Sequence, residues 1–379
     1  MSRHNNDWID KLIASQRPGY SLDQAFYRDP QIFARDLERV ICNHWMMAGH
    51  VSQIPRPGDQ FLFEVAGRSV VIRRGENASV LAHDKAPCHV QLLEGLILVC
   101  LAPGNPPSLE EVAKTLKPFL QLQGIGEAQV AKRKSFELQA NWKLAVENYL
   151  ECYHCKPAHP QYSRVEIKVE RFGDGSPAAL ARFEERYRTW RNEVEQKGAW
   201  IEDAATKLPL DERLPRAQFC AAYRAPLRVE YSSATEDGQP AAPLMGEFKN
   251  YDGGETAIGL GPFTYMLAAN DHAVFFQFIP SDAENSEMIV TWLVQAEAEE
   301  GRDYDLKRLT WLWTLTTLQD KTIIEANRAG IYSRHYQPGP ASLLEADVTG
   351  FRNWYLALVG PENHLSDLKP GAQGRYFGL

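Results

Sequence analysis

The side chains best suited to chemistry are concentrated in residues 141–160, which read N-W-K-L-A-V-E-N-Y-L-E-C-Y-H-C-K-P-A-H-P. Within thirteen residues this segment holds two carboxylates, one amide and two imidazoles: Glu147, Asn148, Glu151, His154 and His159. The apolar residues among them are spaced as in a buried helix. Because an ionisable side chain is costly to bury unless it is paired or binds a metal, we expect His154 and His159 to converge on one ion. Two imidazoles and one carboxylate, with coordination positions left open, are the arrangement that holds non-haem iron(II).

Spacing alone leaves other interpretations of this segment open. The two histidines can be unrelated surface or core residues. Cys152 and Cys155 form a C-x-x-C pair, which can bind zinc or act as a redox pair. The chain has no second C-x-x-C pair, so a structural zinc site is poorly supported. Six cysteines scattered over 379 residues favour reduced thiols over a disulfide framework.

The longer string, N-W-K followed by E-N-x-x-E-x-x-H-x-x-x-x-H-P, resembles the iron-binding signature of the catalytic alpha subunits of Rieske-type ring-hydroxylating oxygenases. Within that superfamily it is most similar to the branch that acts on quaternary amines such as glycine betaine, choline and carnitine. The resemblance extends over nearly the whole chain, through S-L-D-Q-A-F-Y-R-D-P, H-W-M-M-A-G-H-V-S-Q-I-P-R-P-G-D, Y-Q-P-G-P and F-R-N-W-Y.

The resemblance implies roles for individual residues. His154 and His159 match two iron ligands, and Asp320 matches the third, because D-K-T-I-I-E-A-N-R resembles a D-x-x-x-x-E-x-x-Q pattern with Arg328 in place of the usual Gln. Glu151 matches the acid that links an iron ligand to the cluster of a neighbouring subunit, and we assign it a catalytic role together with Asn148. The alternative for Glu151 is that it only orients an imidazole, as ligating histidines commonly require.

The chain departs from the family where the family carries its Rieske cluster. That cluster needs two cysteines and two histidines, in a C-x-H and a later C-x-x-H. From Val80 to Leu101 the sequence contains neither half, since Cys88 and His89 are adjacent, and Cys100 reads as a buried strand residue. We therefore expect mononuclear Fe(II) but no [2Fe-2S] cluster in this chain. Hydroxylation with O2 consumes two external electrons, so a separate cluster-bearing subunit or a reductase is the expected electron source.

Composition narrows the class of partner. The net charge is -8 and no run of Lys or Arg stands out, which makes nucleic acid and anionic membranes unlikely partners. The N-terminus has no apolar signal region and no apolar run is long enough to span a bilayer. We expect a cytoplasmic protein that forms a trimer or hetero-oligomer.

The element pattern predicts an α+β protein with three parts. Residues 1–46 form a helical lead-in with one amphipathic helix from Leu22 to Trp45, and residues 47–106 form a remnant Rieske-like β domain without cluster ligands. Residues 107–379 form the catalytic domain, in which a curved antiparallel sheet wraps around helices in the helix-grip shape that the resemblance implies. Its expected strands are Ala128–Glu137, Phe219–Ala222, Glu247–Tyr251, Ala257–Gly259, Thr264–Ala268, His272–Ile279 and Glu287–Val294, followed by a helix over Leu306–Arg328.

Four aromatic residues of the expected sheet are candidates for the substrate wall. Strand alternation places some of Phe263, Tyr265, Phe276 and Phe278 toward the iron. Aromatic faces can hold a quaternary ammonium group by cation–π attraction. Aromatic residues in a half-buried sheet are also ordinary core.

Three functions fit the sequence. The first is an oxygenase subunit that hydroxylates or N-dealkylates a small substrate of the quaternary-amine class with O2, using electrons from a cluster-bearing partner. The second is a non-catalytic companion subunit. The third is an iron enzyme that works without external electrons. Three potential ligands argue against the second function, and Glu151 favours the first over the third.

Overall fold

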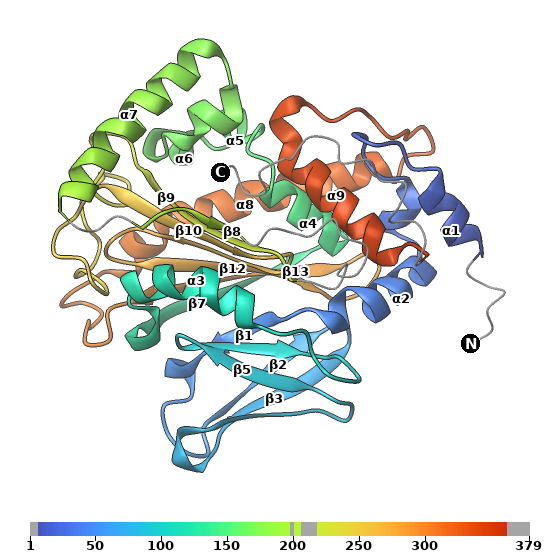
Figure 1. Ribbon diagram of the computed structural model, residues 1–379, viewed down its shortest axis with the longest axis horizontal. Helices are drawn as coiled ribbons and strands as arrows, with labels where there is room; N and C mark the ends of the chain where they lie inside the picture. The colour runs from blue at the N-terminus through green and yellow to red at the C-terminus, as the bar shows by residue number, and fades with distance from the viewer. Residues whose placement is uncertain (1–6, 198–200, 206–217, 362–379) are drawn as a thin grey trace.

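The structure is a computed structural model that describes residues 7–197, 201–205 and 218–361 (Figure 1). Two of the predicted parts lie partly outside the described residues. The lead-in does so at residues 1–6, and the catalytic domain at residues 198–200, 206–217 and 362–379. Among the described helices, none is long and apolar enough to cross a membrane.

A seven-stranded antiparallel sheet organises the larger part of the chain. The strands lie in the order β7-β13-β12-β11-β10-β9-β8. Their bounds are β7 (Gln129–Leu138), β8 (Ala204–Ala205), β9 (Cys220–Pro226), β10 (Gly254–Leu260), β11 (Thr264–Ala268), β12 (Ala273–Pro280) and β13 (Ser286–Val294). Every residue of β10, β11 and β12 is buried, so both faces of the sheet are covered. The predicted α+β class is thus confirmed.

Helices cover the two faces of this sheet. Figure 1 shows α4 (Trp142–Tyr149), α8 (Leu306–Ile331) and α9 (Ala346–Val359) on one side and α3 (Glu110–Leu122) on the other. Helix α8 begins where the Asp305 side chain accepts the backbone N–H of Arg308 at 2.8 Å, which caps an otherwise unpaired donor. The helix predicted over Leu306–Arg328 is therefore confirmed.

Two small sheets lie against the other side of α3 (Figure 1). One has the order β1-β6-β5 and the other β2-β3-β4. Their bounds are β1 (Met46–His50), β2 (Gln60–Val65), β3 (Arg68–Arg74), β4 (Val80–His83), β5 (His89–Leu93) and β6 (Leu96–Cys100). Glu94 and Gly95 both have positive φ, which is the two-residue hairpin turn that joins β5 to β6. Sequence reasoning did not predict β1 or β5.

The single helix predicted from Leu22 to Trp45 is wrong. The segment is divided into η2 (Gln24–Tyr27), α2 (Pro30–Arg39) and η3 (Ile41–Asn43). Pro30 has no N–H to donate and restricts Asp29 to an extended conformation, so a helix can begin there but not pass through. The Asp29 carboxylate accepts the N–H groups of Gln31 and Ile32 and caps the new start.

The strand predicted at Glu247–Tyr251 is also wrong, because this segment is an irregular loop. The Phe248 N–H bonds to the Met245 carbonyl and closes a turn. Gly246 has a positive φ and lies against the Leu122 carbonyl, where a Cβ would come within 2.2 Å. The backbone therefore turns here to pass the end of α3. The charged residues 184–195 lie in a helix, α7 (Pro177–Gln196), with Phe183 and Trp190 on its buried face.

Candidate metal centre and cavity

The two histidines of the motif lie in a chain of short helices after α4. His154 directly precedes α5 (Cys155–Ala158), and His159 lies between α5 and α6 (Pro160–Val165). Because the residue before a proline is disfavoured in the helical region, Pro160 keeps His159 out of both helices, at φ -122° and ψ 73°. The break turns the His159 side chain inward, where it is 1% exposed.

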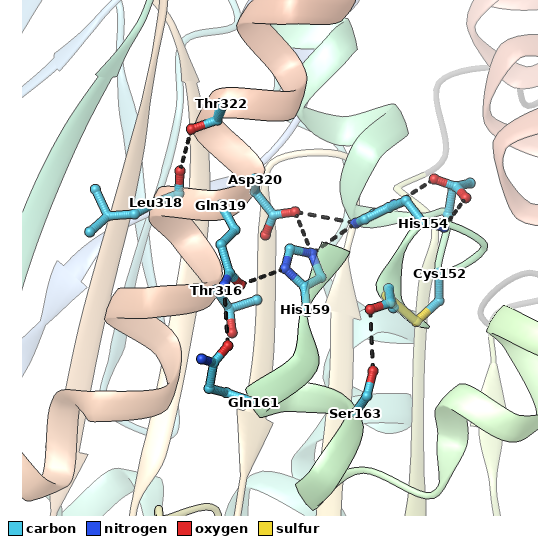
Figure 2. A network of polar contacts seen from close by, with 12 residues as sticks. Cys152, His154, His159, Gln161, Ser163, Thr316, Leu318, Gln319, Asp320 and Thr322 are labelled. Atoms are coloured by element: carbon cyan, nitrogen blue, oxygen red, sulfur yellow. Dashed lines mark hydrogen bonds and ion pairs between the residues drawn. A yellow bond between two sulfur atoms is a disulfide. The ribbon is translucent and has the colours of Figure 1, made fainter. Parts of the chain in front are cut away.

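Three ligand atoms meet at one point beside α8. His154 Nε2 and His159 Nε2 are 3.1 Å apart, and Asp320 Oδ1 lies 3.2 Å from the first and 3.0 Å from the second. Figure 2 shows Asp320 reaching from α8 toward both imidazoles. The side chains of His154 and Asp320 are 17% and 19% exposed, so this point is close to solvent on one side.

The outer nitrogen of each imidazole has its own acceptor. His154 Nδ1 lies 2.6 Å from Glu151 Oε2, and His159 Nδ1 lies 2.8 Å from Gln319 Oε1. The Gln319 amide in turn donates to Gln161 Oε1 at 3.2 Å, which fixes its carbonyl toward His159 (Figure 2). A carboxylate and an amide carbonyl only accept, so both Nδ1 atoms carry a proton, and each Nε2 would turn a lone pair toward a metal ion bound between them.

This donor set fits a divalent metal ion. Two imidazole lone pairs and a carboxylate oxygen facing one point repel one another unless a proton or a cation lies between them. Burial alone would lower the pKa of His154, but its hydrogen bonds to Asp320 and Glu151 raise that pKa to about 9. Burial would raise the pKa of Asp320, and the two histidines lower it. The position between these side chains therefore attracts positive charge. Two imidazole nitrogens and a carboxylate oxygen are also the ligand types that iron(II) takes in such sites.

Cys152 and Cys155 form a disulfide, which corrects the expectation of reduced thiols for this pair. Cys155 Sγ, His154 and His159 have ligand atoms within 4.8 Å of one another. We exclude Cys155 from the ligand set because its sulfur is bonded to Cys152, whereas Asp320 Oδ1 lies at about 3 Å from both imidazoles. Cys42, Cys88, Cys100 and Cys220 are free, and Cys100 is buried in β6 as predicted.

A cavity of about 160 Å³ opens beside these ligands. Asn148, Glu151, His154, His159 and Asp320 all contribute to its wall. Three of the four predicted aromatic residues line it as well, namely Tyr265, Phe276 and Phe278.

Phe263 does not line the cavity, which corrects its place in the predicted wall. It shares the sheet face with Tyr265, but its ring packs against Trp142 of α4 at a centroid distance of 5.3 Å and is fully buried. Trp142 fills the space that a substrate would need there. Glu147 is also away from the site, since it accepts hydrogen bonds from Tyr27 and Arg352 in the core.

Sequence reasoning missed several residues of the cavity and its surroundings. Gln319 precedes the predicted ligand Asp320, but its contact with His159 follows only from the docking of α6 on α8. Tyr149 was read only as an apolar helix position, although its ring lies 4.3 Å from that of Tyr265 in the cavity wall. Trp313 lies two helical turns before Asp320 on α8 and faces the same space, a spacing that a helical projection could have found.

Comparisons with known proteins agree with this geometry. Residues 125–360 match the family model described as the ring hydroxylating alpha subunit (catalytic domain). A glycine betaine monooxygenase oxygenase subunit from Chromohalobacter salexigens is 28% identical over 401 residues, covering 91% of this chain and 87% of that protein. A carnitine monooxygenase oxygenase subunit from Escherichia coli is 24% identical over 230 residues, covering 45% and 61% of the two chains.

Solved structures share the fold. The quaternary ammonium Rieske monooxygenase CntA superposes with a TM-score of 0.65 at 17% identity, covering 92% of this chain and 98% of that one. A naphthalene dioxygenase superposes with a TM-score of 0.59 at 15% identity, covering 93% and 95%. The family match spans well over half of the sequence and includes all three converging side chains. The chain therefore belongs to the ring-hydroxylating alpha subunit family, as an oxygenase subunit of the Rieske non-haem iron type.

Proposed function

We propose that this chain is the catalytic subunit of a mononuclear iron(II) oxygenase that hydroxylates or N-dealkylates a small quaternary-amine substrate, with electrons from a separate cluster-bearing partner. The observation that carries the proposal is the meeting of His154 Nε2, His159 Nε2 and Asp320 Oδ1 within 3.2 Å of one another. These three residues would hold the iron. Bound there, iron(II) would supply O2 activation for insertion of one oxygen atom into a C–H bond.

Glu151 and Gln319 prepare the ligands for this role. By accepting the Nδ1–H of each imidazole, they hold the ring orientation and keep the Nε2 lone pair aimed at the metal position. Glu151 is further fixed because its other oxygen accepts the backbone N–H of His154 at 2.8 Å.

Glu151 is also the proposed link to the electron donor. Its side chain is 16% exposed, and the neighbouring Tyr153 is 51% exposed, so the acid lies between an iron ligand and the surface. A partner that docks over Tyr153 would reach Glu151 without displacing core residues. Asn148 borders the cavity beside the same loop and is the second proposed catalytic residue.

The proposal that this chain lacks its own [2Fe-2S] cluster rests on residues 80–101. Here β4 is followed by the hairpin of β5 and β6, in which His89 pairs with Cys100 across the strands. The alignment to the Chromohalobacter protein spans 401 positions although it uses 91% of a 379-residue chain, so that relative has segments that this chain lacks. We interpret residues 47–106 as a Rieske-like β domain that has lost its cluster loops, and residues 107–379 as the catalytic domain.

The proposed substrate class follows from the cavity wall and the relatives. Tyr265, Phe276, Phe278 and Trp313 present aromatic faces near the proposed iron position, and such faces attract methylated ammonium groups. The relatives from Chromohalobacter salexigens and Escherichia coli are named as oxygenase subunits of glycine betaine and carnitine monooxygenases. A mixed oligomer with an intact, cluster-bearing relative would bring that relative's cluster to Glu151.

The test is metal content together with optical absorption on the anaerobically purified chain. We expect about one iron per chain in the unmodified protein and none in Asp320→Asn or His154→Ala, with Thr322→Ala on α8 as a control that keeps its iron. We also expect no iron–sulfur absorption until a cluster-bearing partner is added. Stoichiometric iron in both ligand variants would refute the ligand set, and cluster absorption of the isolated chain would refute the borrowed-electron part.

A further inference from the structure

A buried lysine, Lys168, lines the cavity and lies between two glutamates. Lys168 follows α6 and is only 3% exposed. Its Nζ forms an ion pair with Glu255 of β10 and lies 3.5 Å from Glu166 Oε2. A buried lysine is uncommon unless it is paired, and here both partners are themselves buried.

Only the cationic member of this cluster reaches the cavity. Lys168 lines it, whereas Glu166 and Glu255 do not, and Lys168 is the one lysine or arginine among the described residues of the lining. Burial alone would lower the pKa of Lys168, but the two carboxylates raise it well above its usual value, so the ammonium is charged. Burial and the neighbouring Glu255 raise the pKa of Glu166 well above its usual value. The cluster presents its ammonium, and neither of its carboxyl groups, to the cavity.

Three tyrosines line the cavity together with this ammonium. Tyr149, Tyr162 and Tyr223 come from α4, α6 and β9, line the same cavity, and each interacts electrostatically with Lys168. Burial raises the pKa of each phenol, so all three are protonated donors. Within the described part of the chain, no hydrogen bond is made by these three hydroxyls. None of these hydroxyls is among the buried side-chain atoms of the described residues that lack a partner, so each is open to the cavity and can donate to a molecule bound there.

The rest of the cavity wall carries mainly carboxylates and apolar side chains. Its carboxylates are those of Glu151, Asp320 and Asp347, and much of its apolar wall is aromatic. The two regions are close, because the ring centroids of His159 and Tyr162 are 6.3 Å apart. A ligand that filled both regions would carry a cation and an anion separated by a short linker.

We propose that Lys168 and the hydroxyls of Tyr149, Tyr162 and Tyr223 form an anion subsite that binds the carboxylate of the substrate, so that the substrate is a zwitterion with its methylated ammonium against Phe276 and Phe278. This inference rests on the proposed function for the assignment of the reacting end. Hydrogen bonds from an ammonium and from phenols to a carboxylate are charge-assisted and roughly twice as strong as neutral ones. They would also satisfy the three tyrosine hydroxyls.

The experiment measures ligand binding to the full chain by calorimetry, with and without iron. The probes are glycine betaine, choline, which keeps the trimethylammonium but has a hydroxyl in place of the carboxylate, and tert-butylacetate, which keeps the carboxylate but has no positive charge. We expect glycine betaine to bind at least about tenfold more tightly than choline. Lys168→Met should remove that advantage and leave the choline affinity within about twofold, while Lys114→Met on the exposed face of α3 should change neither.

Two further variants keep the test decisive if Lys168→Met disturbs folding. Lys168→Met with Glu255→Gln removes both members of the closer ion pair, so Glu255 is not left as a buried carboxylate without its cation. Tyr223→Phe removes only one hydroxyl and should weaken glycine betaine about threefold while sparing choline. Equal affinities for glycine betaine and choline, or parallel losses for both in these variants, would overturn the subsite.

Binding and turnover separate this inference from the proposed function. A chain that binds glycine betaine through Lys168 but oxidises no methylated amine when iron and electrons are supplied would refute the oxygenase proposal and retain the subsite. A chain that oxidises glycine betaine equally well in the unmodified protein and in Lys168→Met would retain the oxygenase and refute the subsite.

Discussion

His159 Nδ1 lies 2.8 Å from the side-chain carbonyl of Gln319, the residue next to the proposed ligand Asp320. One turn of α8 therefore both supplies a ligand and orients another. We predict that Gln319→Leu keeps the fold but lowers iron affinity about tenfold to a hundredfold, because the imidazole loses the acceptor that fixes its tautomer. Iron titration monitored by competition with a chelator would measure this. Thr322→Ala, one turn away on the exposed side of α8, is the matched control.

A substitution at Glu151 should separate the effects on metal binding from those on electron delivery. Glu151→Gln retains an acceptor for the His154 ring, so we expect iron content close to that of the unmodified chain. Partner-driven turnover should fall at least about tenfold, since the charge between the iron ligand and the surface is lost. Single-turnover assays with the reduced partner check the rate. A rate equal to the unmodified protein would reduce Glu151 to a residue that only positions His154.

The Cys152–Cys155 disulfide encloses the loop that carries His154. Titration of the denatured, unreduced chain should give four reactive thiols, and reduction should raise the number to six. Because the closed loop is very short, a Cys152→Ser/Cys155→Ser variant should lose little global stability. We expect its main effect to be weaker iron binding through a looser His154. Six thiols before reduction would contradict the disulfide.

Two buried histidines predict a loss of stability in acid. Burial lowers the pKa of both His44 and His50 from 6.5 to about 4. A histidine whose pKa is lower in the folded state contributes stability above its unfolded pKa and loses it as the pH falls through the window from about 6.5 to 4. Between pH 7.5 and pH 5, each of the two histidines should lower the protein's free energy of unfolding by roughly 2 kcal/mol. Urea unfolding at the two pH values measures this, and His50→Gln should remove about half of the difference.

Lys143 and Asp36 form an ion pair in the core, and both side chains are fully buried. Tyr355 also donates to Asp36, at 2.6 Å, which joins α2, α4 and α9. We predict that Lys143→Met destabilises the chain by about 3–5 kcal/mol, because it leaves the Asp36 carboxylate without its cation. Asp36→Asn combined with Lys143→Met should recover most of that loss. Denaturant unfolding of the single and double variants completes the cycle, and an additive double variant would contradict direct coupling.

The sequence was most informative where chemistry depends on residue type and short spacing. His154 and His159 were predicted as partners because two imidazoles in an apolar segment need a common ligand, and the match of Asp320 to the family pattern added the carboxylate. Most strands of the large sheet followed from alternation, because buried faces impose a period of two, but β8 was not predicted and Glu247–Tyr251 is a loop. The helix predicted over Leu306–Arg328 corresponds to α8.

Other features depended on how distant segments pack. Nothing near Phe263 in the sequence distinguishes it from Tyr265, and only the docking of Trp142 decides that Phe263 is core. The proposed anion subsite joins Tyr149, Lys168 and Tyr223 from three separate segments, so no local pattern could predict it. The hydrogen bond between Gln319 and His159 spans 160 residues. The sequence by itself determined which side chains could bind a metal, whereas the tertiary structure decided which of them share a cavity, because that proximity comes from long-range packing.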